Sequence, residues 1–170
     1  VAYQKQLSEL VNWVERQDNI GYVDALTAQI KELNQKLNSD EKDYFKIPNS
    51  RELIAQSLLV YEMSLPMGMG MDHYINFDRS SSRLTVYLHK STSKQLIKLD
   101  EDILAQAKEY YPALQLKPGT GLDMVFAKIS DSNSLSLLQG TAVALLLISL
   151  ILILALKSMR LGIISIVPNI

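Results

Sequence analysis

The first 64 residues carry apolar positions at helical spacing in three segments. Charged residues separate the apolar positions of each segment, so we expect three amphipathic helices. Their apolar stripes are Tyr3, Leu7, Leu10, Val11 and Val14; Leu26, Ile30, Leu33 and Leu37; and Leu53, Ile54, Leu58 and Tyr61. Asn49 is placed to cap the third helix, with Glu52 reaching back as in a capping box. Between the first two helices, Tyr22 and Val23 form a short strand candidate.

After a loop at 65–70 that contains proline and glycine, the pattern changes to that of strands. The stretches HYINFD and RLTVYLH are two strand candidates, separated by the polar residues 79–82. In the second, Leu84, Val86 and Leu88 alternate with less apolar residues. We therefore expect an antiparallel hairpin with one buried face and one face in water.

A fourth helix, a short strand and a fifth helix follow. The fourth helix has capping residues at 91–93 and is closed by Pro112; its apolar positions are Leu96, Ile97, Ile103, Leu104 and Ala107. A short strand at 114–116 precedes a turn at 117–121. Apolar positions at Leu122, Val125, Phe126 and Ile129 then predict an amphipathic helix that leads into a much longer apolar segment.

That segment, 132–156, contains no charged residue, and eleven of the seventeen residues from Gly140 to Leu156 are Leu, Ile or Val. At about 1.5 Å of rise per residue, 135–156 covers the roughly 30 Å of a bilayer's hydrocarbon. A helix of a soluble core, the alternative, would carry a polar face. The sequence therefore predicts a transmembrane helix over 132–156, including its lead-in.

A link at 157–160 connects this helix to a second apolar run, 161–170, which we interpret as the start of the next transmembrane helix. Lys157 and Arg160 are the two basic residues after Lys128, so they determine the topology: the link lies in the cytoplasm and residues 1–131 lie across the membrane. Because the chain starts at Val1 and the second run is cut short, we expect an internal fragment of a longer membrane protein.

The predicted elements of 1–131 fit an α+β fold. If one strand preceded Val1, their order would be β-α-β-β-α-β, the unit of a ferredoxin-like sandwich, with about 26–64 as a helical insertion. A mostly helical bundle that carries one hairpin is the alternative.

Composition limits the chemistry of this outer domain. Before Ser132 there are 15 basic and 18 acidic residues, a net charge of −3, which argues against a nucleic-acid partner. The absence of cysteine excludes disulfides and thiolate metal sites. The acids at 100–102 are consecutive and so do not converge on one point, which indicates a solvated face. The turn at 119–121 lacks the third glycine of a dinucleotide fingerprint. We expect no enzyme activity, cofactor or catalytic residue.

Four of the six methionines, Met63, Met67, Met69 and Met71, lie within nine residues. Thioethers at this spacing are able to bind Cu(I), whereas methionine also fills gaps in cores and forms adaptable apolar surfaces. Three interpretations stay open: packing, a substrate-pathway or hinge role, and metal binding. We take the four as candidate substrate-pathway or hinge residues and predict no metal site.

Three stretches of the chain resemble a known family. They are LLVYEMSLP at 58–66, the Gly119-Thr120-Gly121 turn that enters a helix, and the ending LKSMRLG with Pro168-Asn169. Over most of the chain they are similar to predicted exporters of the resistance-nodulation-division (RND) superfamily, including MMPL-type proteins. The resemblance implies that 1 to about 130 belong to the first large periplasmic loop, a porter domain. It also implies that 135–156 is the second transmembrane helix and that the third begins at Leu161.

The function implied by the resemblance is proton-driven export of hydrophobic or amphiphilic substrates, lipid-like or drug-like, by a multi-pass protein of the bacterial inner membrane. Its expected partners are the lipid bilayer, the substrate, and further copies or accessory proteins. The proton relay must lie elsewhere, because 132–156 holds no ionisable group. Two alternatives remain: a membrane-tethered extracytoplasmic sensor or binding module that signals through its helix, and an accessory protein that scaffolds a complex.

Overall fold

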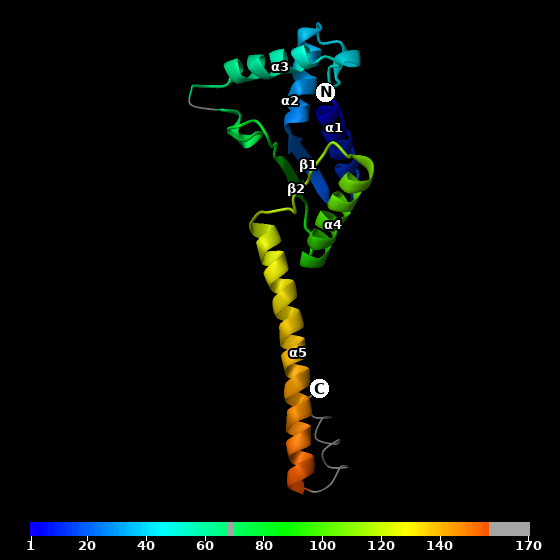
Figure 1. Ribbon diagram of the computed structural model, residues 1–170, viewed down its shortest axis with the longest axis vertical. Helices are drawn as coiled ribbons and strands as arrows, with labels where there is room; N and C mark the ends of the chain where they lie inside the picture. Colours follow the sequence, from blue (N-terminus) through cyan, green and yellow to red (C-terminus); the bar gives the residue numbers. More distant parts are fainter. Residues whose placement is uncertain (68–69, 157–170) are drawn as a thin grey trace. The chain divides into compact units, whose positions relative to one another are not determined.

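A computed structural model describes residues 1–67 and 70–156 of the chain (Figure 1). In order, the elements are α1 (Ala2–Val14), β1 (Ile20–Ala25), α2 (Leu26–Leu37), the 3-10 turn η1 (Lys42–Tyr44), α3 (Arg51–Ser64), the 3-10 turn η2 (Met71–His73), β2 (Leu84–Leu88), α4 (Ser93–Tyr110) and α5 (Leu122–Leu156). This mixture of helices with an antiparallel sheet confirms the α+β class. The chain divides into two compact units, one of residues 1–91 and 98–119, the other of 92–97 and the chain from 120 onward.

The main core of the first unit lies on one face of the sheet formed by β1 and β2. The α1 stripe from Leu7 to Val14 is buried there, as its spacing predicts. The cross-strand pairs Val23–Val86 and Ala25–Leu84 point into the same cluster. The cluster is completed by residues of α4 and of the chain after it, namely Ile103, Ala107, Tyr111, Leu114 and Leu116. A helical layer of α1 and the C-terminal part of α4 therefore covers this face.

A second cluster joins α2 to α3, the region predicted as a helical insertion. Leu26 and Ile30 of α2 are fully buried, and they pack with Ile47 and with Ile54 of α3. Asn34 fixes the intervening loop, because its amide nitrogen donates to the carbonyl oxygens of Tyr44 and Lys46 at 2.7 and 3.0 Å. The remaining members, Leu58, Tyr74 and Ile75, are partly buried.

The strand pairing differs from the predicted hairpin. β2 pairs with β1, not with the HYINFD stretch, which forms η2 and a turn with a single bridge between Ile75 and Ser82. The reason is local: the Asn76 side chain bonds the Ser80 hydroxyl and the Ser81 amide, both at 2.9 Å, and Arg79 adopts a φ of 55°. These contacts stabilise a turn where a strand would have to continue.

Three further details correct the sequence interpretation. Ser50, not Asn49, caps α3, since its Oγ accepts from the Leu53 amide at 3.3 Å, while Asn49 accepts from the Lys5 amine. Leu53 itself is 48% exposed, because α3 is apolar on more than one face. The stretch 114–116, predicted as a short strand, is not hydrogen-bonded into a sheet with any of the described residues.

The helix starts before and after this stretch agree with expectation. Thr92 and Gln95 form a reciprocal capping box at the start of α4: the Gln95 amide donates to Thr92 Oγ1 at 3.3 Å and the Thr92 amide donates to Gln95 Oε1 at 2.9 Å. Gly121 precedes α5 with a φ of 128°, a conformation that suits glycine. Helix α5 then continues without a break from the predicted amphipathic part into the apolar segment.

Candidate functional site

Helix α5 is long, and its apolar side chains are mostly unburied. Its 35 residues extend about 52 Å at 1.5 Å of rise per residue, more than the roughly 30 Å of bilayer hydrocarbon. Only 6% of its most apolar window is buried, whereas the core helix of a soluble protein buries most of such a surface. Within the described residues, α5 is the one helix long and apolar enough to cross a membrane.

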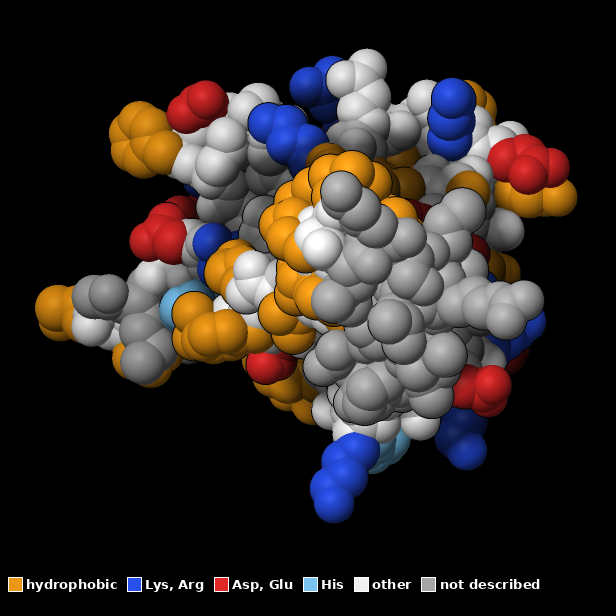
Figure 2. Space-filling view, turned by 90° about the horizontal axis from the view of Figure 1, so that it is seen from below, with side chains coloured by type: hydrophobic (Ala, Val, Ile, Leu, Met, Phe, Trp, Pro, Cys, Tyr) orange, Lys and Arg blue, Asp and Glu red, His pale blue; other side chains and the backbone are white. Residues whose placement is uncertain are grey.

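Polar groups in α5 are distributed as a membrane environment requires. Its charged residues, Asp123, Lys128 and Asp131, all lie in the first third of the helix. Farther along, the Ser149 hydroxyl donates to the Leu145 carbonyl oxygen at 2.8 Å, so this polar group is satisfied within the helix. The side chains of α5 visible in Figure 2 are hydrophobic or uncharged. The Ser149 hydroxyl therefore needs no partner outside α5.

The four methionines of the candidate substrate pathway do not share one environment. Met63, near the end of α3, is 78% exposed, and Met67 is fully exposed. Met71 is 5% exposed and begins η2, where its carbonyl oxygen accepts from the amide of Tyr74. Met69 lies outside the described residues, as do Lys157 and Arg160. Packing thus accounts for Met71, whereas Met63 and Met67 present thioethers to the surroundings.

Helix α3 exposes an apolar face that the sequence interpretation had not singled out. Leu53, Leu59, Val60 and Met63 are all at least 40% exposed and lie within about one third of the helix circumference. We call these four residues the α3 apolar face. The sequence does contain an indication of this face, because Leu59, Val60 and Met63 are apolar and lie outside the predicted stripe of α3. A surface of this kind suits an apolar ligand or partner.

A polar cluster around Tyr74 anchors the segment that follows the loop at 65–70 to the sheet and α2. Burial, followed by a hydrogen bond to Asp24, raises the pKa of Tyr74 to about 12. The Tyr74 hydroxyl also accepts from Gln29 Nε2 at 3.4 Å, and its ring meets Tyr61 edge to face at 6.2 Å between centroids. The hydrogen bonds and the ring contact of Tyr74 therefore connect this segment to β1, α2 and α3.

The end of α3 is tied to the turn before β2. Arg79 Nη2 lies 3.2 Å from Glu62 Oε2, next to Met63 in the helix. Both side chains are largely exposed, so this ion pair contributes little to stability. Its consequence is geometric, because it holds the turn before β2 close to the C-terminal end of α3.

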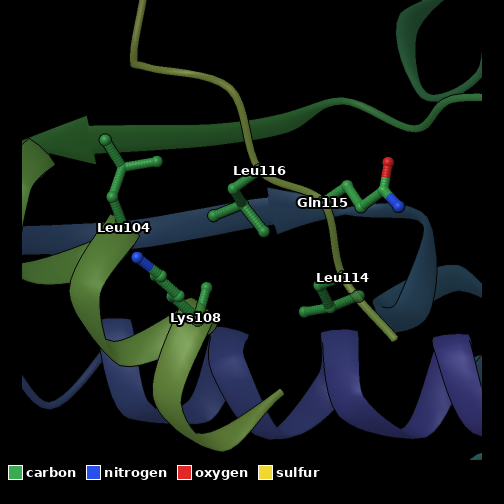
Figure 3. A pocket seen from close by; sticks show the side chains of 6 residues that line it. Leu104, Lys108, Leu114, Gln115 and Leu116 are labelled. Atoms are coloured by element: carbon green, nitrogen blue, oxygen red, sulfur yellow. The ribbon is translucent and has the colours of Figure 1, made fainter. Parts of the chain in front are cut away.

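A pocket of about 280 Å³ lies between α4 and the extended stretch after it (Figure 3). Leu104, Lys108, Leu114 and Leu116 extend toward a common space, whereas Gln115 points away from it. The sixth lining residue is Ala107. Leucine side chains with one amine at the rim suit an apolar side chain or tail with a polar or anionic end.

Within residues 1–67 and 70–156, no group of three or more His, Cys, Asp or Glu residues is close enough to hold a metal ion. The acidic run at 100–102 is not simply a solvated face, since Asp100 Oδ1 accepts from the Gly119 amide at 2.7 Å. The described residues do carry three apolar features, namely α5, the α3 apolar face and the pocket.

No protein-family model, curated protein or solved structure matches this chain.

Proposed function

We propose that this chain is part of a proton-driven membrane exporter that moves hydrophobic or amphiphilic substrates outward. α5 would cross the inner membrane, and the first unit would lie in the periplasm and form part of the substrate path. The observation that carries the proposal is α5: a 35-residue helix, uncharged over 132–156, whose apolar window is only 6% buried. Such a helix is stable in lipid and costly to expose to water.

Apolar surface outside α5 supports a role in handling apolar substrates. The α3 apolar face and Met67 offer flexible and branched apolar side chains that are at least 40% exposed. Methionine-rich surfaces adapt to ligands of different shape. In this proposal Met63 and Met67 contact substrate, and the buried side chain of Met71 fixes the chain directly after the loop at 65–70.

We further propose that the first unit is a ferredoxin-like porter domain in which β2 pairs with one more strand. The amide of His89 donates to Asn19, which directly precedes β1, so the alternating strand geometry directs the N–H and C=O groups of Tyr87 and Thr85 toward β1 and those of Val86 to the opposite edge. Val86 occupies the centre of this edge and is only partly buried, although it faces the core. An additional strand would cover both its backbone and its side chain.

The start of α1 is positioned for such a strand to enter. The hydroxyl of Tyr3 is hydrogen-bonded to that of Ser82, two residues before β2 begins. A strand that leads into α1 would therefore end beside the start of β2 and run antiparallel to it. The pocket lined by Leu104, Leu114 and Leu116 would then receive its apolar side chains. With this strand added, the sheet strands, α1 and α4 follow the order β-α-β-β-α, the first five elements of the β-α-β-β-α-β unit.

The second candidate, a membrane-tethered sensor or binding module, is favoured by one observation. α5 continues unbroken from Leu122 to Leu156, so a displacement at its start would be carried rigidly toward the other side of the membrane. The two candidates differ in what they predict for transport, because a sensor binds its ligand without lowering the amount inside the cell.

The test is efflux by the full-length protein in cells loaded with a fluorescent amphiphilic dye. We expect energy-dependent efflux that a protonophore abolishes and that Met63→Asp reduces several-fold, because a charge opposes apolar binding. Leu37→Asp is the matched control, since Leu37 is an apolar helix residue of α2 with 58% exposure. Dye retention equal to that of cells lacking the protein would contradict export and favour the sensor.

A further inference from the structure

The methionines that the structure describes fall into two classes of exposure. Met63 is 78% exposed and Met67 is fully exposed, whereas Met71 and Met124 are only 5% and 7% exposed. Two of these thioethers are therefore open to solvent, while protein covers the other two. This difference controls how fast a dissolved oxidant reaches each sulfur atom, because a buried thioether reacts only after a local opening of the fold.

Met63 lies within the α3 apolar face. Leu59 and Val60 precede it by four and three residues, so the three exposed side chains are neighbours on one side of the helix. Oxidation of the thioether to a sulfoxide converts a flexible apolar side chain into a polar one. A sulfoxide at Met63 therefore places a hydrogen-bond acceptor, with the water bound to it, among the apolar side chains of α3.

Met67 follows closely in the chain. Helix α3 ends at Ser64, the backbone of Leu65 is extended, and Met67 comes two residues later. Because the side chains of Met63 and Met67 are both exposed, a sulfoxide at either position displaces no packed neighbour. At Met71, in contrast, a sulfoxide would introduce a polar group into packed surroundings. Oxidation of the two exposed methionines thus changes the surface while the core stays intact.

We infer that Met63 and Met67 form a reversible oxidation site that regulates the α3 apolar face. The oxidant is a hypohalous acid, for example hypochlorous acid. The sulfur lone pair attacks the chlorine atom and hydroxide leaves; water then supplies the sulfoxide oxygen, and chloride departs. One thioether and one HOCl thus give one sulfoxide, one chloride ion and one proton, so sulfur loses the two electrons that chlorine gains. A dithiol-dependent reductase reverses the change and forms a disulfide and water.

The consequence of the oxidation is weaker binding of an apolar substrate to α3. A substrate that covers the oxidised face has to displace the water bound to the sulfoxide, and an apolar group offers no hydrogen bond in exchange. This effect on substrate rests on the proposed function, whereas the modification itself rests only on the exposure of the two thioethers.

The modification is tested by treating cells that express the full-length protein with a limiting amount of hypochlorous acid. Fragmentation mass spectrometry of the isolated protein assigns each added oxygen to a single residue. We expect the sulfoxide to be about ten-fold or more abundant at Met63 and Met67 than at Met71 and Met124. Equal oxidation of the exposed and the buried methionines would overturn the site.

The regulation is tested in the same cells by efflux of the fluorescent amphiphilic dye, measured relative to cells that lack the protein. Oxidation should lower this efflux several-fold in wild type and in Met71→Leu, a substitution that conserves volume. The double variant Met63→Leu and Met67→Leu, compared with its own untreated rate, should lose much less, because leucine is apolar and contains no sulfur. The double variant also controls for general damage to the cells.

An equal fractional loss of efflux in wild type and in the double variant would overturn the regulation. Absence of dye efflux before any treatment would contradict the proposed function and, with it, the regulation. The sulfoxide pattern decides the oxidation site in either case, because mass spectrometry does not depend on transport.

Discussion

The carboxylate of Asp100 accepts a hydrogen bond from the backbone amide of Gly119 at 2.7 Å. This contact joins α4 to the last residues of the first unit, just before the chain enters α5. Hydrogen bonds to charged groups contribute about 1.5 to 3 kcal/mol when their partners are partly buried. The acidic run at 100–102 thus includes one carboxylate with a structural role, which its spacing alone does not reveal.

Removing this carboxylate should loosen the turn before α5. In Asp100→Ala we expect hydrogen exchange of the Gly119 amide to accelerate about ten-fold or more, corresponding to the loss of about 1.5 kcal/mol or more. Asp100→Asn keeps an acceptor oxygen and should give an intermediate rate. The exposed neighbour provides the control, since Asp102→Ala should leave the rate unchanged. Equal rates in wild type and Asp100→Ala would show that the turn is held by other contacts.

Leu10 and Leu37 both belong to predicted apolar stripes, but their different burial should give substitutions at the two positions different effects on stability. Leu10 is 0% exposed in the main core, whereas Leu37, at the end of α2, is 58% exposed. We expect Leu10→Ala to lower the free energy of unfolding by about 2 to 5 kcal/mol through lost burial and a cavity. Leu37→Ala should change it by less than about 0.5 kcal/mol. Urea titration of the full chain in detergent measures both, and similar losses would argue against the described core.

These two leucines also show which buried positions helical spacing predicts correctly and which it does not. Helical spacing identifies the face of α1 that is buried, because the apolar positions from Leu7 to Val14 pack in one cluster with the sheet. It fails at Leu37 and Leu53, where a helix end and a helix with apolar residues on both sides leave apolar positions uncovered. The sequence also does not predict the pairing of β2 with β1, because alternation of apolar and polar residues indicates a strand but not its partner. The spacing also does not reveal the α3 apolar face, because it predicts Leu53 on the buried stripe and leaves Leu59 and Val60 unassigned.

Stability should fall in strongly alkaline solution because of Tyr74. Its pKa is raised to about 12 in the folded chain, against an ordinary value of 10.0, so the folded state favours the neutral phenol. The resulting stabilisation is fully present below pH 10 and is lost as pH rises from about 10 to 12. In Tyr74→Phe this part of the pH dependence should disappear. Phenolate absorbance at alkaline pH, compared between the two proteins, reports the ionisation directly; a Tyr74 contribution titrating near pH 10 would contradict the buried, Asp24-bonded phenol.

The proposed extra strand makes a residue-specific prediction for the edge of β2. The amides of Thr85 and Tyr87 face β1, so they should exchange slowly whether or not another strand is present. The amide of Val86 faces the opposite edge, where protection requires a further strand. In the full-length protein we expect the Val86 amide to exchange at least a hundred-fold more slowly than that of Phe77, which lies in an exposed turn. Hydrogen exchange resolved to single residues by fragmentation mass spectrometry measures this. If Val86 exchanges as fast as Phe77 while Thr85 and Tyr87 stay protected, β2 is a free edge and the ferredoxin-like porter proposal is wrong.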